Sequence, residues 1–265
     1  MVNFVFQVVQ TTIIQLLSLF GIFFVFGFIL SKIQTAVLRN YLGSVGWRGL
    51  LWTAWLGTPI HEYSHALMAV IFRHKIDQVV LFSPNASTGE LGHVNHSYNP
   101  RSFYQSLGNF FIGLAPLIIG PVILVVLLYI LVSQGREVFS QLAGSESSFS
   151  AFIKGIINFL SSLFSWTNLT SYRFWVFLYI SFCIASHLAP SRSDQKSMWQ
   201  GWLVIVVYLF IFNLAARLFS RDISNYIFNF SNFFSGLITV YIYVLVISFI
   251  HFLLSFLILL PWRKR

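Results

Sequence analysis

Long apolar runs separated by short polar loops set the pattern of this sequence. A run of about 20 apolar residues is long enough to cross the hydrocarbon core of a bilayer as a helix. Runs near or above this length predict six transmembrane helices, over residues 11–33, 50–72, 103–132, 172–188, 202–219 and 237–260. We therefore expect an all-α polytopic membrane protein in which residues 1–265 form a single transmembrane domain.

The ends and linkers of these runs carry further patterns. No Lys or Arg precedes the first run and no small-residue cleavage site follows it, so residues 11–31 are expected to be a retained span rather than a signal peptide. Residues 150–166 place Lys154 and several Ser and Asn on one helical face and apolar residues on the other, which predicts a helix in the membrane interface. Asparagines at helical spacing predict a helix on the membrane surface over residues 221–232.

Residues 73–102 form the longest stretch whose pattern is neither helical nor transmembrane. Short apolar runs over residues 79–82 and 91–96 flank a segment with Pro, Asn and Gly, which is typical of a turn. This pattern predicts a small β-hairpin over about residues 77–98, inserted after the second transmembrane helix. An unpaired edge of the hairpin could bind an extended peptide through backbone hydrogen bonds, and an ordinary interfacial loop is an equal alternative.

Two histidines lie within this hairpin segment. His93 and His96 are three residues apart, and side chains at that spacing on a strand face opposite sides. The two imidazoles are therefore not expected to bind one metal ion, and we predict both to be surface histidines.

The composition supports a membrane location. Hydrophobic residues make up 57% of the chain and charged residues 9%, whereas about a quarter of a soluble domain is charged, and the mean hydropathy is +0.78. The formal charge of +9 comes from Lys and Arg scattered among short loops and the C-terminal tail, which favours contact with anionic lipid over binding to nucleic acid. Cys183 is the only cysteine, so no disulfide or thiolate metal site is available within the chain.

The second predicted span contains the motif H-E-x-x-H. On a helix, His61 and His65 share one face, so both imidazoles can bind a single Zn²⁺ ion. Glu62 lies about 100° further round, where its carboxylate can accept a proton from an activated water molecule. In the alternative interpretation both histidines are core residues bonded to the backbone and Glu62 is a paired carboxylate. Ionisable residues in membrane segments are costly, which favours a functional site with the chemistry of a hydrolase.

The motif supplies two ligands, whereas a catalytic zinc ion usually has three protein ligands and one open position. With six spans, the ends of the second and fourth spans emerge on the same side, so the loop that contains Asp194 can approach His61 and His65. Asp194 is the predicted third ligand, and a solvated loop carboxylate paired with a neighbouring base is its alternative. His187 is the second choice as third ligand, or else a hydrogen-bond partner of a ligand.

The third predicted span is rich in small and helix-breaking residues. Pro116 and Pro121 predict an irregular path and the glycines allow close helix packing, and both features suit a buried polar site. Asn109 is the candidate for binding substrate backbone, although a bond to a neighbouring helix is the more common role of such a residue.

An H-E-x-x-H motif in a membrane helix, followed by a β-hairpin and later by a Pro-containing segment ending in Asp, resembles the site-2 protease group of intramembrane zinc metalloproteases, the M50 clan. The resemblance covers about residues 50–200. It implies that Zn²⁺ is bound by His61, His65 and Asp194 and that Glu62 is the catalytic base. It also implies that a strand edge of the hairpin presents an unwound substrate helix.

The second motif of that family is only partly present. Ser186 stands in place of the usual Asn, and Gln195 follows Asp194 in place of Gly. The resemblance implies a zinc metalloendopeptidase that cleaves transmembrane protein substrates, in a multi-pass protein whose active site faces the cytoplasmic side. Two other functions stay open, a membrane zinc hydrolase that acts on a lipid or glycan and a non-enzymatic transporter or assembly protein.

Overall fold

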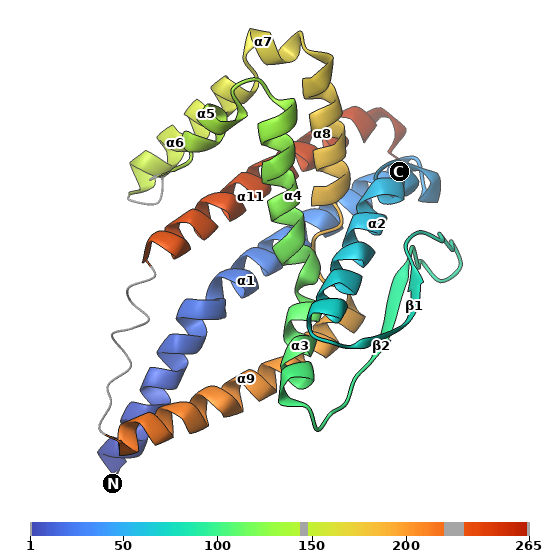
Figure 1. Cartoon of the computed structure of the whole chain (residues 1–265). Helices are drawn as coiled ribbons and strands as arrows, with labels where there is room; N and C mark the ends of the chain where they lie inside the picture. The colour runs from blue at the N-terminus through green and yellow to red at the C-terminus, as the bar shows by residue number, and fades with distance from the viewer. Residues whose placement is uncertain (1, 144–147, 220–230, 264–265) are drawn as a thin grey trace.

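The chain folds into a bundle of helices with one small β-hairpin at its side (Figure 1). The computed structural model describes residues 2–143, 148–219 and 231–263. Most of the predicted surface helix over residues 221–232 lies outside these ranges. Within the described ranges, the prediction of a helical fold with a hairpin after the second helix is confirmed.

The helices differ widely in length. In chain order they are α1 (Val2–Ser44), α2 (Trp47–Ile71), α3 (Phe103–Gly113), α4 (Ala115–Leu131), α5 (Gly135–Ser140), α6 (Phe149–Leu163), α7 (Trp166–Leu169), α8 (Tyr172–Ala185), α9 (Arg192–Leu218) and α11 (Ser231–Leu259). Strands β1 (Lys75–Val80) and β2 (His93–Ser97) form an antiparallel pair. A short 3-10 turn, Leu260–Trp262, follows α11.

Among the described residues, three helices are long and apolar enough to cross a membrane, namely Phe4–Ser44, Arg192–Leu218 and Ser235–Trp262. A fourth span results if α3 and α4, which meet at a bend of 56°, are counted together. These helices indicate an integral membrane protein, but they are fewer than the six spans predicted. Helix α2 has 25 residues, but the polar side chains of its motif lower its hydropathy, and α8 has only 14 residues.

Several helices extend beyond the apolar runs that predicted them. Helix α1 has 43 residues, whereas the predicted span covered residues 11–33. Helix α9 begins at Arg192, well before the predicted start at residue 202, because the Ser191 side chain caps its first turn. An apolar run marks the part of a helix that contacts lipid or core, whereas caps and backbone hydrogen bonds determine where the helix begins and ends.

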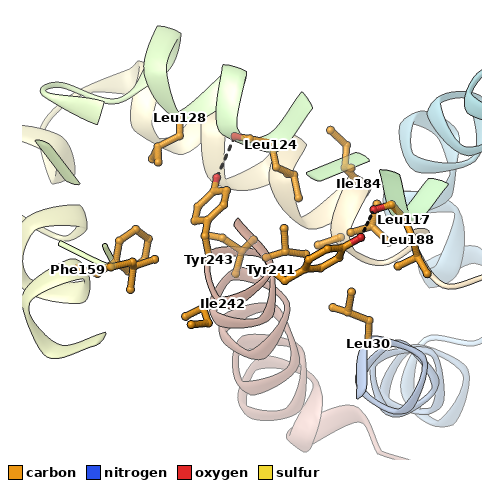
Figure 2. Packing of buried hydrophobic residues seen from close by; sticks show 14 of the residues in the cluster. Leu30, Leu117, Leu124, Leu128, Phe159, Ile184, Leu188, Tyr241, Ile242 and Tyr243 are labelled. Carbon is orange, nitrogen blue, oxygen red and sulfur yellow. Dashed lines mark hydrogen bonds between the residues drawn. The ribbon is translucent and has the colours of Figure 1, made fainter. Parts of the chain in front are cut away.

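The main hydrophobic core lies where α4, α8 and α11 meet (Figure 2). Its largest buried side chains include Phe174 and Phe177 of α8 and Tyr241 and Tyr243 of α11. Helix α6, which corresponds to the predicted interface helix, contributes Phe159 to the same core. The two buried tyrosine hydroxyls need hydrogen-bond partners, because a buried polar group without one costs about 1–3 kcal/mol.

A proline in α4 explains one of these partners. Pro121 has no backbone N–H, so the carbonyl of Leu117, four residues earlier, lacks its usual helical donor. The Tyr241 hydroxyl donates to that carbonyl at 2.7 Å. The Tyr243 hydroxyl donates at 3.0 Å to the carbonyl of Leu124, which lies in a part of α4 where the helical donor is present (Figure 2). Tyr241 thus replaces a missing backbone hydrogen bond, whereas Tyr243 adds a second one.

Tyr241→Phe is expected to lower the free energy of unfolding by about 1–3 kcal/mol, because it leaves the Leu117 carbonyl buried without a donor. Tyr243→Phe is the matched control and should cost less, about 0.5–1.5 kcal/mol, since the Leu124 carbonyl keeps its helical N–H. Thermal unfolding of the purified chain in detergent measures both changes. Equal losses of stability in the two variants would contradict this account of α4.

Candidate metal centre

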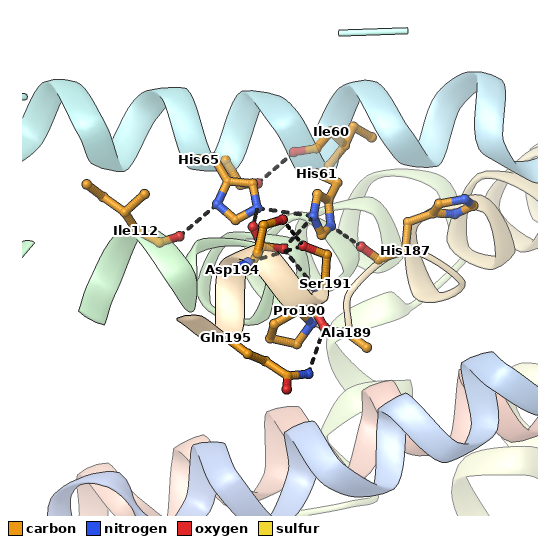
Figure 3. A network of polar contacts seen from close by, with 12 residues as sticks. Ile60, His61, His65, Ile112, His187, Ala189, Pro190, Ser191, Asp194 and Gln195 are labelled. Atoms are coloured by element: carbon orange, nitrogen blue, oxygen red, sulfur yellow. Dashed lines mark hydrogen bonds and ion pairs between the residues drawn. The ribbon is translucent and has the colours of Figure 1, made fainter. Parts of the chain in front are cut away.

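Helix α2 presents the two histidines of the motif on one face (Figure 3). The ring centroids of His61 and His65 are 4.7 Å apart, and their Nε2 atoms are 3.1 Å apart. The shared face that the four-residue spacing predicted is therefore present.

Backbone carbonyls hold the other nitrogen of each ring. Nδ1 of His61 lies 2.5 Å from the carbonyl oxygen of His187, and Nδ1 of His65 lies 2.7 Å from that of Ile112. A carbonyl oxygen only accepts, so each Nδ1 carries the proton and each neutral ring has its lone pair on Nε2. Two lone pairs that face each other at 3.1 Å repel unless a cation lies between them. Metal-binding histidines are commonly oriented by a bond from the second ring nitrogen to a backbone carbonyl, as both rings are here.

The carbonyl of Ile112 is available because of a proline. In a continuous helix it would accept the N–H of residue 116, but Pro116 has none. Helix α3 ends at Gly113, and the chain bends by 56° into α4. The irregular path predicted from the prolines is confirmed, and it provides the acceptor for His65.

Asp194 completes the cluster from the first turn of α9. Its Oδ2 atom is 3.4 Å from Nε2 of His61, and its Oδ1 atom is 3.4 Å from Nε2 of His65. The ligand atoms of the three residues all lie within 4.8 Å of one another. In the described part of the chain, this is the one group of three or more such side chains that could hold a metal ion.

The helix cap of α9 fixes the carboxylate of Asp194. Oδ2 of Asp194 accepts the N–H of Ser191 at 2.7 Å, and the Ser191 hydroxyl accepts the N–H of Asp194 at 3.2 Å, which together form a capping box. The prediction that Asp194 lies in a loop is therefore wrong, because this Ser-x-x-Asp pattern starts a helix. The same carboxylate caps α9 and contributes to the metal cluster.

Two glycines bring together the helices that carry these groups. A Cβ atom at Gly113 would lie 2.5 Å from the carbonyl oxygen of Asp194, so α3 and α9 approach this closely only without a side chain. A Cβ atom at Gly57 would lie 2.2 Å from the carbonyl oxygen of Cys183, where α2 packs against α8. The first contact places Asp194 beside the end of α3, and the second places the end of α8, which the His187 carbonyl follows, beside α2.

His187, the second choice as third ligand, orients a candidate ligand instead of joining the cluster. Its ring bonds through Nδ1 to the carbonyl of Cys183 at 3.0 Å, and Figure 3 shows the ring directed away from Asp194. Its backbone carbonyl is the acceptor for His61. The structure thus gives this residue the role of a hydrogen-bond partner of a ligand.

Glu62 lies beside the cluster and is not part of it. This residue is 8% exposed and lines a cavity of about 900 Å³ that the two motif histidines and Asp194 also line. Among the described residues, none forms a hydrogen bond or ion pair with its carboxylate. Gly92 of the hairpin lies against it, since an added Cβ atom would be 3.1 Å from Cγ of Glu62. The hairpin therefore covers the Glu62 side chain without bonding to its oxygens.

The cavity is bordered by several parts of the chain that are distant in sequence. Its lining comes from α1, the motif face of α2, the end of α3, the hairpin over residues 89–96 and the segment over residues 189–195. Strand β2 borders the cavity directly, and within the described residues it pairs with β1 alone. One edge of β2 is therefore unpaired beside the cavity.

Asn109, the candidate for binding substrate, is not at the cavity. It is 2% exposed, and its carbonyl accepts the Ser197 hydroxyl of α9 at 3.4 Å. Asn109 thus lies in the packing between α3 and α9, because the bend that opens the site comes after it, at the end of α3.

The two hairpin histidines differ in their surroundings. His93 is partly exposed and pairs with Glu90 at 2.7 Å. Both residues are intermediate in burial and both line the cavity, but Nδ1 of His96 also lies 2.9 Å from Nδ1 of His74. The sequence gave no sign of this pair, because hairpin pairing brings the two residues together across 22 positions.

Residues outside the motif also hold the site, and the sequence analysis missed them. Gln34 of α1 accepts the N–H of Ala189 at 3.0 Å and so holds the segment before α9. A polar side chain inside a long apolar helix was the available signal. Pro116 marks the Ile112 carbonyl as lacking a helical donor, but nothing in the sequence indicates that His65 is its partner, and the His187 carbonyl carried no signal.

No protein-family model, curated protein or solved structure matches this chain. Its chemistry is therefore inferred from the geometry of the cluster and the cavity. In the cluster, the two imidazole lone pairs and the Asp194 carboxylate surround one point. The Glu62 carboxylate lines the same cavity and has no bonding partner among the described residues.

Asp194→Ala is expected to weaken metal binding by more than roughly 10-fold, because even the outer partners of metal ligands are worth about 10- to 100-fold in affinity. Elemental analysis of purified protein, after dialysis against a graded series of free Zn²⁺, measures the occupancy. Asp77→Ala, which removes a more exposed carboxylate of the hairpin, should retain the wild-type occupancy. Unchanged occupancy in Asp194→Ala would exclude Asp194 as a ligand.

Gly113→Ala is expected to weaken metal binding by about 10- to 100-fold although it removes no ligand, because the new methyl group displaces the first turn of α9. Gly21→Ala is the control, since a Cβ atom there meets nothing within 4 Å. The same titration with Zn²⁺ compares the two variants. Equal affinities would show that contact between α3 and α9 does not position the carboxylate.

Proposed function

We propose that this protein is an intramembrane zinc metalloprotease, which hydrolyses peptide bonds of membrane-embedded protein substrates. The observation that carries the proposal is the convergence of two Nε2 lone pairs and the Asp194 carboxylate beside Glu62, at a cavity bordered by a free strand edge. The three membrane-type helices support the part of this proposal that puts the reaction at or within a bilayer.

The donor set suits Zn²⁺. Two histidine nitrogens and one carboxylate oxygen are a common ligand set of catalytic zinc, and they leave a fourth position open. The bonds from Nδ1 of His61 and His65 to backbone carbonyls already select the tautomer that binding requires. When bound, the ion supplies Lewis-acid activation of water and of a carbonyl oxygen.

Glu62 is the proposed general base. It follows His61 directly in α2, and it lines the same cavity as the cluster. Its carboxylate has no partner among the described residues, so its oxygens are available to accept a proton from the attacking water and to pass that proton to the leaving amine nitrogen. The hairpin around Gly92 limits the access of bulk water to this carboxylate.

Strand β2 is the proposed binding element for the substrate. A helical substrate hides its carbonyl groups in backbone hydrogen bonds, so a segment must unwind before it can be cleaved. The unpaired edge of β2 offers backbone donors and acceptors to such an extended segment beside the cavity. By resemblance to site-2 proteases, we place the opening of this cavity toward the cytoplasmic side.

Glu62→Gln is expected to lower the turnover of model transmembrane peptides by about 10²- to 10⁴-fold while leaving the bound zinc in place, since the amide cannot accept the proton. Cleavage in detergent is followed by mass spectrometry, and zinc by elemental analysis. Glu137→Gln, at an exposed position of α5, should match the wild type.

Two other results would replace the proposal, one from offering lipid and glycan substrates to the same protein and one from its metal analysis. Hydrolysis of lipid or glycan substrates without cleavage of any peptide would identify a membrane hydrolase with the same centre. Purified protein that binds no stoichiometric metal under any condition would favour a transporter or an assembly protein.

A further inference from the structure

A chain of two imidazoles lies at the base of the hairpin, outside the metal cluster. His74 is 6% exposed, and its Nε2 lies 2.8 Å from the carbonyl oxygen of Gln105. Its Nδ1 lies 2.9 Å from Nδ1 of His96 on β2. Its ring also stacks on Tyr98, with centroids 5.1 Å apart. The Gln105 and Tyr98 contacts hold the His74 ring, and the hydrogen bond between His74 and His96 in turn positions the His96 ring.

The same contacts determine where the protons lie. The Gln105 carbonyl only accepts, so Nε2 of His74 carries a proton, and Nδ1 of neutral His74 is an acceptor. His96 must then donate from Nδ1, which leaves the lone pair of neutral His96 on Nε2. Both rings are neutral at pH 7, because burial lowers the pKa of His74 and of His96 below the ordinary value.

The unprotonated nitrogen of His96 has no partner, since in the described part of the chain no group bonds to Nε2 of this ring. His96 is one of the residues that line the cavity, as are its β2 neighbours His93, Val94 and Asn95. Along β2, side chains alternate between the two faces, so His96 lies on the same face as Val94 and opposite to His93 and Asn95. The contact with His74 uses only Nδ1 of His96. A purely structural role of His96 would therefore leave the acceptor at Nε2 unexplained.

We propose that His96 is a specificity-determining residue that accepts a hydrogen bond from a donor side chain of the substrate. This inference rests on the proposed function, in which an extended segment pairs with the free edge of β2. Directly paired residues of neighbouring strands place their side chains on the same face, with Cβ atoms about 4.5–5.5 Å apart. The substrate residue beside His96 therefore meets an acceptor without a proton, which favours Thr, Ser, Asn or Gln over Val or Asp.

The proton arrangement is tested first, by histidine-selective ¹⁵N NMR of the full chain in detergent. The expected result is a His96 signal with unprotonated Nε2, assigned by its loss in His96→Gln. In His74→Phe the donor bond is gone, and His96 is expected to show a mixture of the two tautomers. A wild-type His96 ring protonated at Nε2 would overturn the proposal, whatever the protein does to peptides.

Specificity is tested with transmembrane peptides in which a single Thr or Val, which differ little in shape, is moved along the cleaved segment. At one position the wild type is expected to prefer Thr by roughly 3- to 10-fold in kcat/KM, the worth of one hydrogen bond. His96→Phe should lose this preference at that position alone, whereas His96→Gln, which keeps an acceptor, should retain part of it. Lys75→Gln, on the exposed side of the hairpin base, should behave as the wild type.

The outcomes separate the two proposals. Cleavage with no position of Thr preference, or a preference that persists in His96→Phe, would overturn the role of His96 and leave the protease intact. Failure of the wild type to cleave any peptide while it binds zinc would overturn the proposed function, and with it this role of His96.

Discussion

Two imidazole rings are held with their lone pairs facing each other and a carboxylate beside them, and the rest of the structure is arranged around this constraint. Nε2 atoms 3.1 Å apart are unfavourable neighbours without a cation, and the Nδ1–H bonds to two carbonyls keep both rings from turning away. Because one carbonyl belongs to α3 and the other follows α8, the orientation of the pair depends on how these helices pack against α2.

Proline supplies the free carbonyls in an otherwise saturated helical backbone. In an apolar bundle, each carbonyl without an N–H partner needs another donor. Pro116 releases the carbonyl of Ile112, which His65 uses, and Pro121 releases that of Leu117, which Tyr241 uses. The same chemistry therefore serves the candidate site at one end of α4 and the stability of the core further along it.

The candidate site combines a membrane setting with access to water. Helices α2 and α8, which carry or support it, are not among the helices that are long and apolar enough to cross a membrane, and they pack against other helices of the bundle. The cavity lies among α1, α2, the end of α3, the hairpin and the start of α9, where an unpaired strand edge and a carboxylate without a bonding partner among the described residues meet. A cavity inside the protein keeps charged side chains away from lipid, where they are costly.

The sequence by itself determined the local features of this protein. The spacing of His61 and His65 placed both rings on one face of a helix, because 3.6 residues make a turn, and the turn residues indicated the hairpin. The topology of six spans also led to Asp194, although the structure supports fewer spans and places this residue in a helix cap.

Only the tertiary structure decided what surrounds these features. The carbonyls that orient the rings, the approach of α3 to α9 at Gly113 and the pairing of His74 with His96 all join residues far apart in the chain. A proline marks a free carbonyl and a glycine allows a close contact, but neither shows in the sequence which helix lies opposite. Hydrophobic periodicity reports which face of an element is buried, and it does not report the partner against which that face is buried.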